Sequence, residues 1–267
     1  MKFLKNLFGK PEASPEQKHL ASYCESLLQE ADFGYEERLQ NLYQKILKQG
    51  DIAVDVGAHS GRHTIPMAAS VGGKGKVIAF EVLPGVIPVL KSKCDEFALT
   101  TVEIKDVALS SAPGAGSFTV ALDRLQESGL LRRDVYNGAT ETEEIQVTIE
   151  TLDHYDFGKV RFIKIDTEGA EFDVLKGAEQ TLRDHKPVIA FEFGENSYKP
   201  YGVNPIEVFE YLEGLGYAVL SILGETLTKE GFQRASVEQR YWDYVACSSK
   251  DLAKVQRILT SYTPVTA

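Results

Sequence analysis

Acidic side chains follow or end several apolar segments, at positions where they could bind a cation or accept a proton. These acids are Asp55, Glu81, Asp106, Asp166 with Glu168, and Glu192. Asp166, Glu168 and Glu171 fall so close together that their carboxylates repel one another unless a cation, a proton or a ligand offsets the charge. The pattern indicates a site for a positively charged ligand, or a base that takes a proton from a substrate. The alternative is a set of acids stabilised by a helix dipole, which suits Glu171 better than the other two.

A glycine-bearing turn follows the apolar segment 52–56, and a helix is expected from about Arg62. The spacing is G-x-x-x-G, which differs from the G-x-G-x-x-G of dinucleotide sites and from phosphate-binding loops that end in G-K-[ST]. Asp55 beside this turn is poorly suited to a pyrophosphate but well suited to an ammonium or a sulfonium. S-adenosylmethionine (SAM) carries both of these cations and no phosphate. The alternative is a structural turn in which Asp55 caps the helix.

Two further acids are placed to bind a nucleoside. Glu81 ends the second apolar segment at the spacing from Gly57 where an acid accepts hydrogen bonds from both ribose hydroxyls. Sites for nicotinamide cofactors and sites for SAM both have an acid at this position, so Glu81 does not show which of the two cofactors is bound. Asp106 is placed to accept a hydrogen bond from the exocyclic amine of adenine, with Val107 and Ala108 against the ring. For both acids the alternative is a solvated strand end.

Short apolar segments alternate with helical ones from residue 51 onwards, which is typical of βαβ units and a parallel, doubly wound sheet. We expect strands over 52–56, 77–80, 102–107, 161–165, 188–193, 217–222 and 243–247, and helices over 64–70, 84–97, 171–184 and 205–215. Residues 117–122 and 144–149 alternate in character, so an antiparallel excursion is expected before the strand at 161–165. The polar segment between them is expected to shape a substrate site. Ligands of such sheets bind at the carboxyl ends of the strands.

Residues 15–48 repeat apolar side chains at helical spacing, with a break near Gly34. We therefore expect two helices in an N-terminal appendage over 1–50, followed by a main domain over 51–267. The first ten residues are basic and weakly amphipathic, but their apolar run is too short for a signal peptide. Contact of the N-terminus with a membrane is not expected, and no segment approaches the ~18 apolar residues of a membrane span.

Charge and cysteine content narrow the class of protein. The chain has 267 residues, with 39 acidic and 29 basic side chains and a net charge of −10. This balance argues against a nucleic-acid partner, although a local basic patch remains compatible with it. The three cysteines are odd in number and widely spaced, which indicates reduced thiols and a cytoplasmic protein.

Five stretches together resemble the FkbM family of SAM-dependent methyltransferases: VDVGAHSG, AFEVLP, DVALS, KIDTEGAEFDVLKGA and IAFEFGEN, in this order and spacing. The resemblance covers roughly residues 50–247. It implies an α/β, class I methyltransferase fold with a seven-stranded, mostly parallel sheet, whose last strand at about 243–247 runs antiparallel. It also implies methylation of a hydroxyl on a carbohydrate, a polyketide or a similar metabolite. The expected partner is thus a small-molecule or glycan acceptor, and a homodimer is a further expectation.

The resemblance also implies roles for individual residues. It places the methionine part of the cofactor at Asp55, Gly57, Ala58, His59 and Gly61, the ribose at Glu81 and Val82, and the adenine at Asp106, Val107 and Ala108. It places Asp166 near the reacting centre and Glu168 beside the acceptor. As the base that activates the hydroxyl, Asp166 or Glu168 comes first, then Glu192, then His63. His59 replaces a glycine that is common in the superfamily, and its role as contact, cap or base stays open.

Two further questions remain open from the sequence. Mg²⁺ could be bound by oxygen atoms of Asp166, Glu168, Glu192 and Asp153, although no spacing demands a metal. Other functions on a similar sheet are a nicotinamide-dependent oxidoreductase, a SAM-binding protein without catalysis, and an N-methyltransferase. The residues Glu195–Tyr198 do not form the N-P-P-Y or D-P-P-Y motif of enzymes that methylate amino groups of nucleic acids.

Overall fold

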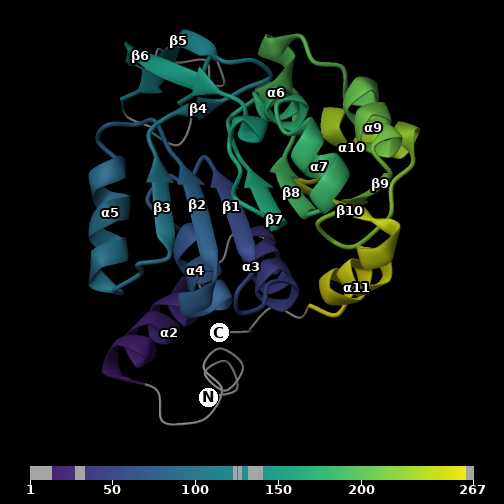
Figure 1. The fold of residues 1–267 in the computed structure, drawn as a ribbon. Helices are drawn as coiled ribbons and strands as arrows, with labels where there is room; N and C mark the ends of the chain where they lie inside the picture. Colours follow the sequence, from purple (N-terminus) through teal and green to yellow (C-terminus); the bar gives the residue numbers. More distant parts are fainter. Residues whose placement is uncertain (1–13, 28–33, 123–124, 126–127, 132–140, 263–267) are drawn as a thin grey trace.

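A seven-stranded sheet forms the centre of the molecule (Figure 1). The structure, a computed structural model, describes residues 14–27, 34–122, 125, 128–131 and 141–262. The strands are β1 (Ile52–Val56), β2 (Lys76–Phe80), β3 (Val102–Lys105), β7 (Val160–Ile165), β8 (Val188–Glu192), β9 (Tyr217–Ser221) and β10 (Asp243–Ser248), in the order β3-β2-β1-β7-β8-β10-β9. Strand β10 is antiparallel to both of its neighbours, β8 and β9, and the other pairs are parallel. The expected class I methyltransferase fold and its antiparallel last strand are therefore confirmed.

The strands are apolar because helices cover both faces of the sheet. One face packs against α3 (Tyr35–Ile46), α4 (Thr64–Val71) and α11 (Ser249–Thr260). The other packs against α6 (Glu171–Lys176), α7 (Glu179–His185), α9 (Pro205–Gly214) and α10 (Lys229–Val237). Along β7, Phe162 enters the first cluster and Ile163 the second, as the alternation of a strand requires.

The N-terminal helices pack directly on this core. In α3, Leu39, Leu42 and Tyr43 are buried among side chains of the sheet, and α2 (Pro15–Leu27) buries Leu20 and Cys24 against α4 and α5 (Ile87–Glu96). The division into 1–50 and 51–267 stays a prediction. The packing nevertheless shows that residues 35–47 add to the core of the sheet.

Several elements differ from the predicted ones in their bounds. The helix expected over 171–184 is two helices, because Gly177 comes so close to another segment that an added Cβ would lie 2.0 Å from the carbonyl oxygen of Ser110. The strand expected over 102–107 ends at Lys105, and a separate strand, β4 (Ala108–Leu109), follows it. The helices α8 (Glu195–Tyr198), α10 and α11 were not predicted.

The expected excursion is a second, three-stranded sheet in the order β4-β6-β5, drawn above the carboxyl ends of β1 to β3 in Figure 1. Strands β5 (Gly114–Ala121) and β6 (Thr142–Glu150) pair antiparallel, as predicted, and β4 pairs with β6 in parallel. Phe118 and Val120 of β5 pack against Val82 and Leu83, which follow β2. Most of the polar segment predicted between β5 and β6 lies outside the described residues.

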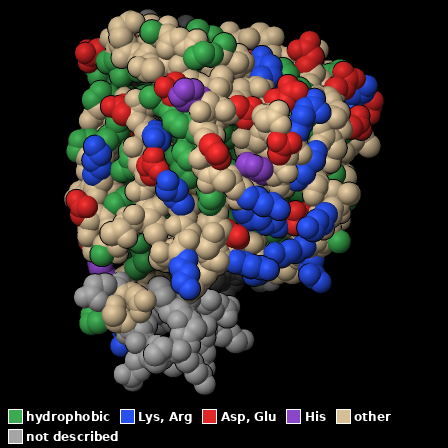
Figure 2. All heavy atoms as spheres, viewed as in Figure 1, with side chains coloured by type: hydrophobic (Ala, Val, Ile, Leu, Met, Phe, Trp, Pro, Cys, Tyr) green, Lys and Arg blue, Asp and Glu red, His purple; other side chains and the backbone are tan. Residues whose placement is uncertain are grey.

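Basic side chains gather on one part of the surface. Figure 2 shows Lys and Arg side chains gathered over α11 and the amino-terminal end of β7. Arg161 of β7 and Lys48 lie near Lys254 of α11, since burial and then the charges of Arg161 and Lys48 lower the pKa of Lys254. The three cysteines are buried and free. Within the described part of the chain, no helix has the length and apolar character to cross a membrane.

Candidate active site

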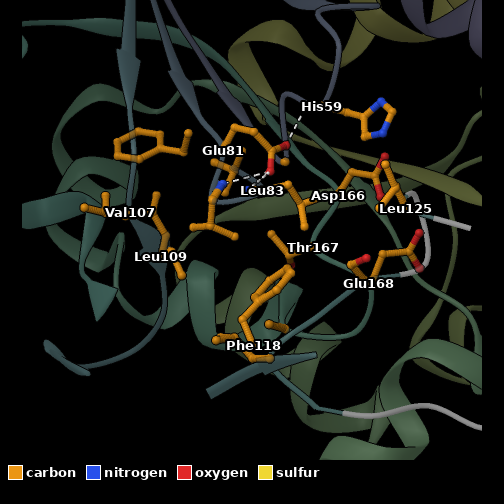
Figure 3. A pocket seen from close by; sticks show the side chains of 18 residues that line it. His59, Glu81, Leu83, Val107, Leu109, Phe118, Leu125, Asp166, Thr167 and Glu168 are labelled. Atoms are coloured by element: carbon orange, nitrogen blue, oxygen red, sulfur yellow. Dashed lines mark hydrogen bonds between the residues drawn. The ribbon is translucent and has the colours of Figure 1, made fainter. Parts of the chain in front are cut away.

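A cavity of about 730 Å³, including space open to solvent, lies at the carboxyl ends of β1, β2 and β7 (Figure 3). Its walls come from the segments after these strands, from β4 and from the excursion. The lining residues are Val56, Gly57, His59, Phe80, Glu81, Val82, Leu83, Val107, Ala108, Leu109, Phe118, Leu125, Ser128, Leu130, Asp166, Thr167, Glu168 and Ala170. This is the size and mixed polarity of a small-molecule site. Eight residues predicted for the site belong to this lining: Gly57, His59, Glu81, Val82, Val107, Ala108, Asp166 and Glu168.

Glu81 is buried at the centre of the cavity wall, where its carboxylate holds two segments together. Its Oε1 accepts hydrogen bonds from the backbone N–H groups of Val82 and Leu83, both at 2.8 Å, and its Oε2 accepts one from His59 at 2.7 Å. A carboxylate has about four acceptor sites. One therefore remains for a ligand hydroxyl, which is the predicted use of this residue.

Gly57 brings the chain after β1 against the chain after β7. Its φ is +78°, and an added Cβ would lie 1.8 Å from the carbonyl oxygen of Asp166. The Asp166 N–H donates to the carbonyl of Val56 at 3.0 Å, which fixes the two segments to each other. Only glycine fits here, and the close contact sets Asp166 at the cavity wall.

Four residues predicted to bind the cofactor do not line the cavity. Asp55 is fully buried within the sheet, and its Oδ2 accepts a hydrogen bond from the side-chain hydroxyl of Thr64, the first residue of α4, at 2.6 Å. Ala58 packs among apolar side chains of α4 and α5, and an added Cβ on Gly61 would meet Leu90 instead of the cavity. Asp106 is exposed beyond the end of β3, while its neighbours Val107 and Ala108 do reach the cavity.

Lys164 supplies a positive charge that the sequence analysis missed. Its ammonium lies 2.8 Å from Oδ2 of Asp166, and the side chain is only 6% exposed. Burial lowers the pKa of Lys164, but the carboxylates of Asp166, Asp55 and Glu36 more than offset this and raise it. Burial raises the pKa of Asp166, and Lys164 lowers it to below the ordinary value. The sequence feature that indicates the Lys164–Asp166 ion pair is the single lysine within the apolar strand segment 162–165, FIKI.

Two further carboxyl groups stand beside Asp166 on the same face of the sheet. Glu192 of β8 and Asp243 of β10 are directly opposite each other in the antiparallel pairing. Burial, followed by the charges of Asp166 and Glu168, raises the pKa of Glu192 well above its ordinary value. Burial, followed by Glu36 and Asp166, raises the pKa of Asp243 to about 8. A hydrogen bond also joins Glu192 and Asp166, and it raises the pKa of Glu192 and lowers the pKa of Asp166.

These two raised pKa values predict that stability falls as pH rises. The folded chain keeps a proton on Asp243 up to about pH 8, whereas the unfolded chain loses it above the ordinary pKa of about 4. The unfolding free energy should therefore decrease between about pH 4 and pH 8, by about 1 kcal/mol per pH unit for Asp243, and the raised pKa of Glu192 acts in the same direction. Asp243→Asn, which stays neutral, should show a smaller decrease in urea titrations between pH 5 and pH 8. The exposed Asp95→Asn is the control, and equal slopes in both variants would contradict this account.

His63 lies outside the cavity, so its predicted role as a base is wrong. Its Nε2 lies 2.7 Å from Oε2 of Glu36, and its Nδ1 is 3.3 Å from the hydroxyl of Tyr43. The ring is 4% exposed. These contacts connect α3 to the start of α4, and both ring nitrogens are used in them.

The acids proposed as Mg²⁺ ligands are engaged in other contacts. Asp153 accepts hydrogen bonds from the N–H groups of Gln180 and Thr181 and so caps α7. Asp166, Glu168 and Glu192 each offer an oxygen within 4.8 Å of the others. The ammonium of Lys164 already compensates the charge of Asp166 in this group, so the residues do not fit a metal and Mg²⁺ gains no support.

Glu171, the first residue of α6, has a structural role in the turn before this helix. Its Oε1 accepts from the N–H groups of Thr167 and Gly169 at 2.8 and 3.0 Å. These bonds hold the turn in which Glu168 adopts a φ of +59°, a conformation rare for a residue with a side chain. The turn presents Thr167 and Glu168 to the cavity. The ring of Tyr201 packs against this turn, so closely that a Cβ added at Gly169 would lie 2.4 Å from a ring carbon.

Two methyltransferases are among the solved structures that are similar to this chain. A methyltransferase FkbM from Methylobacillus flagellatus KT is 14% identical, with a TM-score of 0.48, over 86% of this chain and 60% of that chain. An O-methyltransferase from Bacillus cereus in complex with SAH is also 14% identical, with a TM-score of 0.47, over 93% and 96% of the two chains. This chain thus spans about three fifths of the length of the Methylobacillus protein.

The family of this chain follows from comparison of its sequence with protein-family models. No curated protein was found to match the sequence. The model of the methyltransferase FkbM domain matches residues 55–219, which is more than half of the chain. That segment contains Gly57, Glu81 and Asp166, the residues that form the centre of the cavity. The chain therefore belongs to the FkbM methyltransferase family.

Proposed function

We propose that this protein transfers a methyl group from SAM to a hydroxyl of a sugar, a polyketide or another small metabolite. The observation that carries the proposal is the cavity itself, in which Glu81 separates an apolar end from an acidic end. Family membership supports methyl transfer, whereas the cofactor and the acceptor are inferred from the chemistry of the lining.

The lining fits the three parts of SAM. Val82, Val107 and Leu109 offer apolar surface to an adenine ring, and Glu81 retains an acceptor for the ribose hydroxyls. Asp166 and Glu168 lie at the other end, where their carboxylates favour a sulfonium and an ammonium. The same carboxylates would repel a pyrophosphate, so the lining argues against a nicotinamide dinucleotide.

The chain would contribute alignment and exclusion of water. When bound, SAM supplies an electrophilic methyl group, and the protein does not need to form a covalent bond. Leu125, Ser128 and Leu130 of the excursion form a wall next to Glu168, which places an acceptor between the excursion and the acidic end. Holding an acceptor hydroxyl in line, in a site closed to water, accounts for much of the rate in such reactions.

Binding of S-adenosylhomocysteine (SAH), SAM and NAD⁺, measured by calorimetry, tests the cofactor. We expect SAM and SAH to bind and NAD⁺ to give no heat. Glu81→Gln should weaken SAH binding by about 10-fold or more, because it removes a charged acceptor from the ribose. Glu103→Gln on the adjacent strand β3 is the control, since this side chain contacts Lys76 and Lys105 outside the cavity. Tight NAD⁺ binding without SAH binding would refute the proposal.

Turnover tests the acceptor class. Release of SAH should be followed with a panel of methyl glycosides, catechols and hydroxylated macrolides in the presence of SAM. The proposal expects turnover with at least one hydroxyl compound, and none with the matched deoxy compound. Binding of SAM without turnover on the panel would favour the alternative of a binding protein without catalysis.

A further inference from the structure

Three of the four residues expected to serve as the base, Asp166, Glu192 and His63, are poorly suited to that role in this structure. Lys164 lowers the pKa of Asp166, which makes this carboxylate a weak proton acceptor. Glu192 is not part of the described cavity lining, and its carboxyl group is hydrogen-bonded to Asp166. His63 is bound to Glu36 and Tyr43 outside the cavity. An imidazole is matched to proton transfer near neutral pH far better than a carboxylate.

His59 is the imidazole in the described lining of the cavity, and its surroundings are unusual in two ways. Its φ of +45° is a left-handed conformation, held by the hydrogen bond from its backbone N–H to Glu81. Its Nε2 is shielded from solvent and has no hydrogen-bond partner among the residues that the structure describes. Strained backbone and an unpaired buried nitrogen both cost free energy, and both are typical of sites that a ligand completes.

Two carboxylates share one end of the cavity with this ring. Figure 3 shows the imidazole of His59 at the same end of the cavity as the carboxylates of Asp166 and Glu168. Glu81 contacts the backbone of His59, and Lys164 lies behind Asp166 as the compensating cation. Anionic neighbours stabilise an imidazolium once it forms. Asp166 would thus assist proton transfer without taking the proton itself.

We propose that His59 is the catalytic base of the methyl transfer, an inference that rests on the proposed function. The proton of the acceptor hydroxyl passes to a ring nitrogen of His59. An electron pair of the hydroxyl oxygen forms the new bond to the methyl carbon as the carbon–sulfur bond breaks. The electron pair of that bond returns to sulfur, which becomes the neutral thioether of SAH. The imidazolium then releases its proton to water after the products leave.

The placement of His59 can be tested without an acceptor. SAM carrying a carbon-13 label on its S-methyl group is bound to the full chain, and isotope-filtered nuclear Overhauser effects from that methyl group are recorded. We expect an effect to a ring proton of His59 and to the α protons of Gly57. Effects to Gly57 without one to His59 would overturn the inference but leave the proposed function standing. Failure of SAM to bind would instead refute the proposed function.

His59→Asn tests the proton transfer with whichever hydroxyl acceptor the wild-type chain methylates best. Asparagine also tolerates the left-handed conformation, so the turn should keep its shape. We expect the affinity for SAM to stay within about threefold while kcat falls by about 100-fold or more, the range for loss of a general base. His154→Asn, an exposed residue of the 3-10 turn Leu152–His154, is the control. A variant His59→Asn with kcat close to that of the wild type would overturn the assignment.

Discussion

Gly57→Ala is expected to abolish SAH binding in calorimetry and to lower the melting temperature of the chain. The added Cβ would lie 1.8 Å from the carbonyl oxygen of Asp166, and the positive φ of +78° is itself unfavourable for alanine. Backbone on both sides must then move, which separates the ends of β1 and β7. Because Asp166 and His59 flank this contact in the cavity lining, the acidic end of the site would lose its arrangement.

Gly73→Ala is the matched control for this substitution. It lies in the short turn Gly72–Lys74 after α4, where nothing is within 4 Å of an added Cβ. We expect SAH affinity equal to that of the wild type and a melting temperature that is unchanged or slightly higher. If Gly57→Ala bound SAH as tightly as Gly73→Ala does, the cavity would not be the cofactor site.

Lys164→Met is expected to have the largest effect on stability. The substitution keeps the length of the side chain but leaves the fully buried Asp55 and the partly buried Asp166 and Glu36 without the cation that compensates them. Removing one partner of a buried pair costs about 3–5 kcal/mol. Urea denaturation at pH 7 should show this loss, and the pKa of Asp166 should rise because Lys164 no longer lowers it.

Lys76→Met provides the comparison for Lys164→Met. The ammonium of Lys76 lies 2.6 Å from Glu103, but its side chain is 46% exposed. Exposed pairs contribute about 0–1 kcal/mol, so this variant should be nearly as stable as the wild type. If both substitutions lowered the unfolding free energy by a similar amount, burial of the Lys164–Asp166 pair would have little effect on stability.

The strands were predicted closely because burial on both faces leaves continuous apolar segments in the sequence. Residues 52–56 coincide with β1, and the other strands of the main sheet differ by one or two residues at their ends. The helix α10 was missed because Lys229–Val237 has a mixed sequence whose apolar residues are few. Its position depends on packing against α9 and the sheet, and tertiary contacts of this kind leave a weak local signal.

The site residues were predicted well where a strand ends and poorly where a side chain belongs to the sheet. Gly57, Glu81 and Asp166 all follow the last paired residues of their strands and reach the cavity. Asp55 is paired with Lys164 inside the sheet, one step before its edge, so its side chain points into the core beside α4. The wall formed by Leu125, Ser128 and Leu130 could not be predicted, because it depends on how the excursion folds back over the main sheet.

The strand order limits how this chain can be divided. Strand β10 lies between β8 and β9, although it comes last of the three in the sequence. A fragment that kept only the segment matched by the family, residues 55–219, would begin inside β1 and stop inside β9. It would also lack β10, so β8 and the remainder of β9 would have no strand to join them. The catalytic unit of this protein therefore extends in both directions beyond its recognisable motifs, and expression trials should retain the chain from α3 through α11.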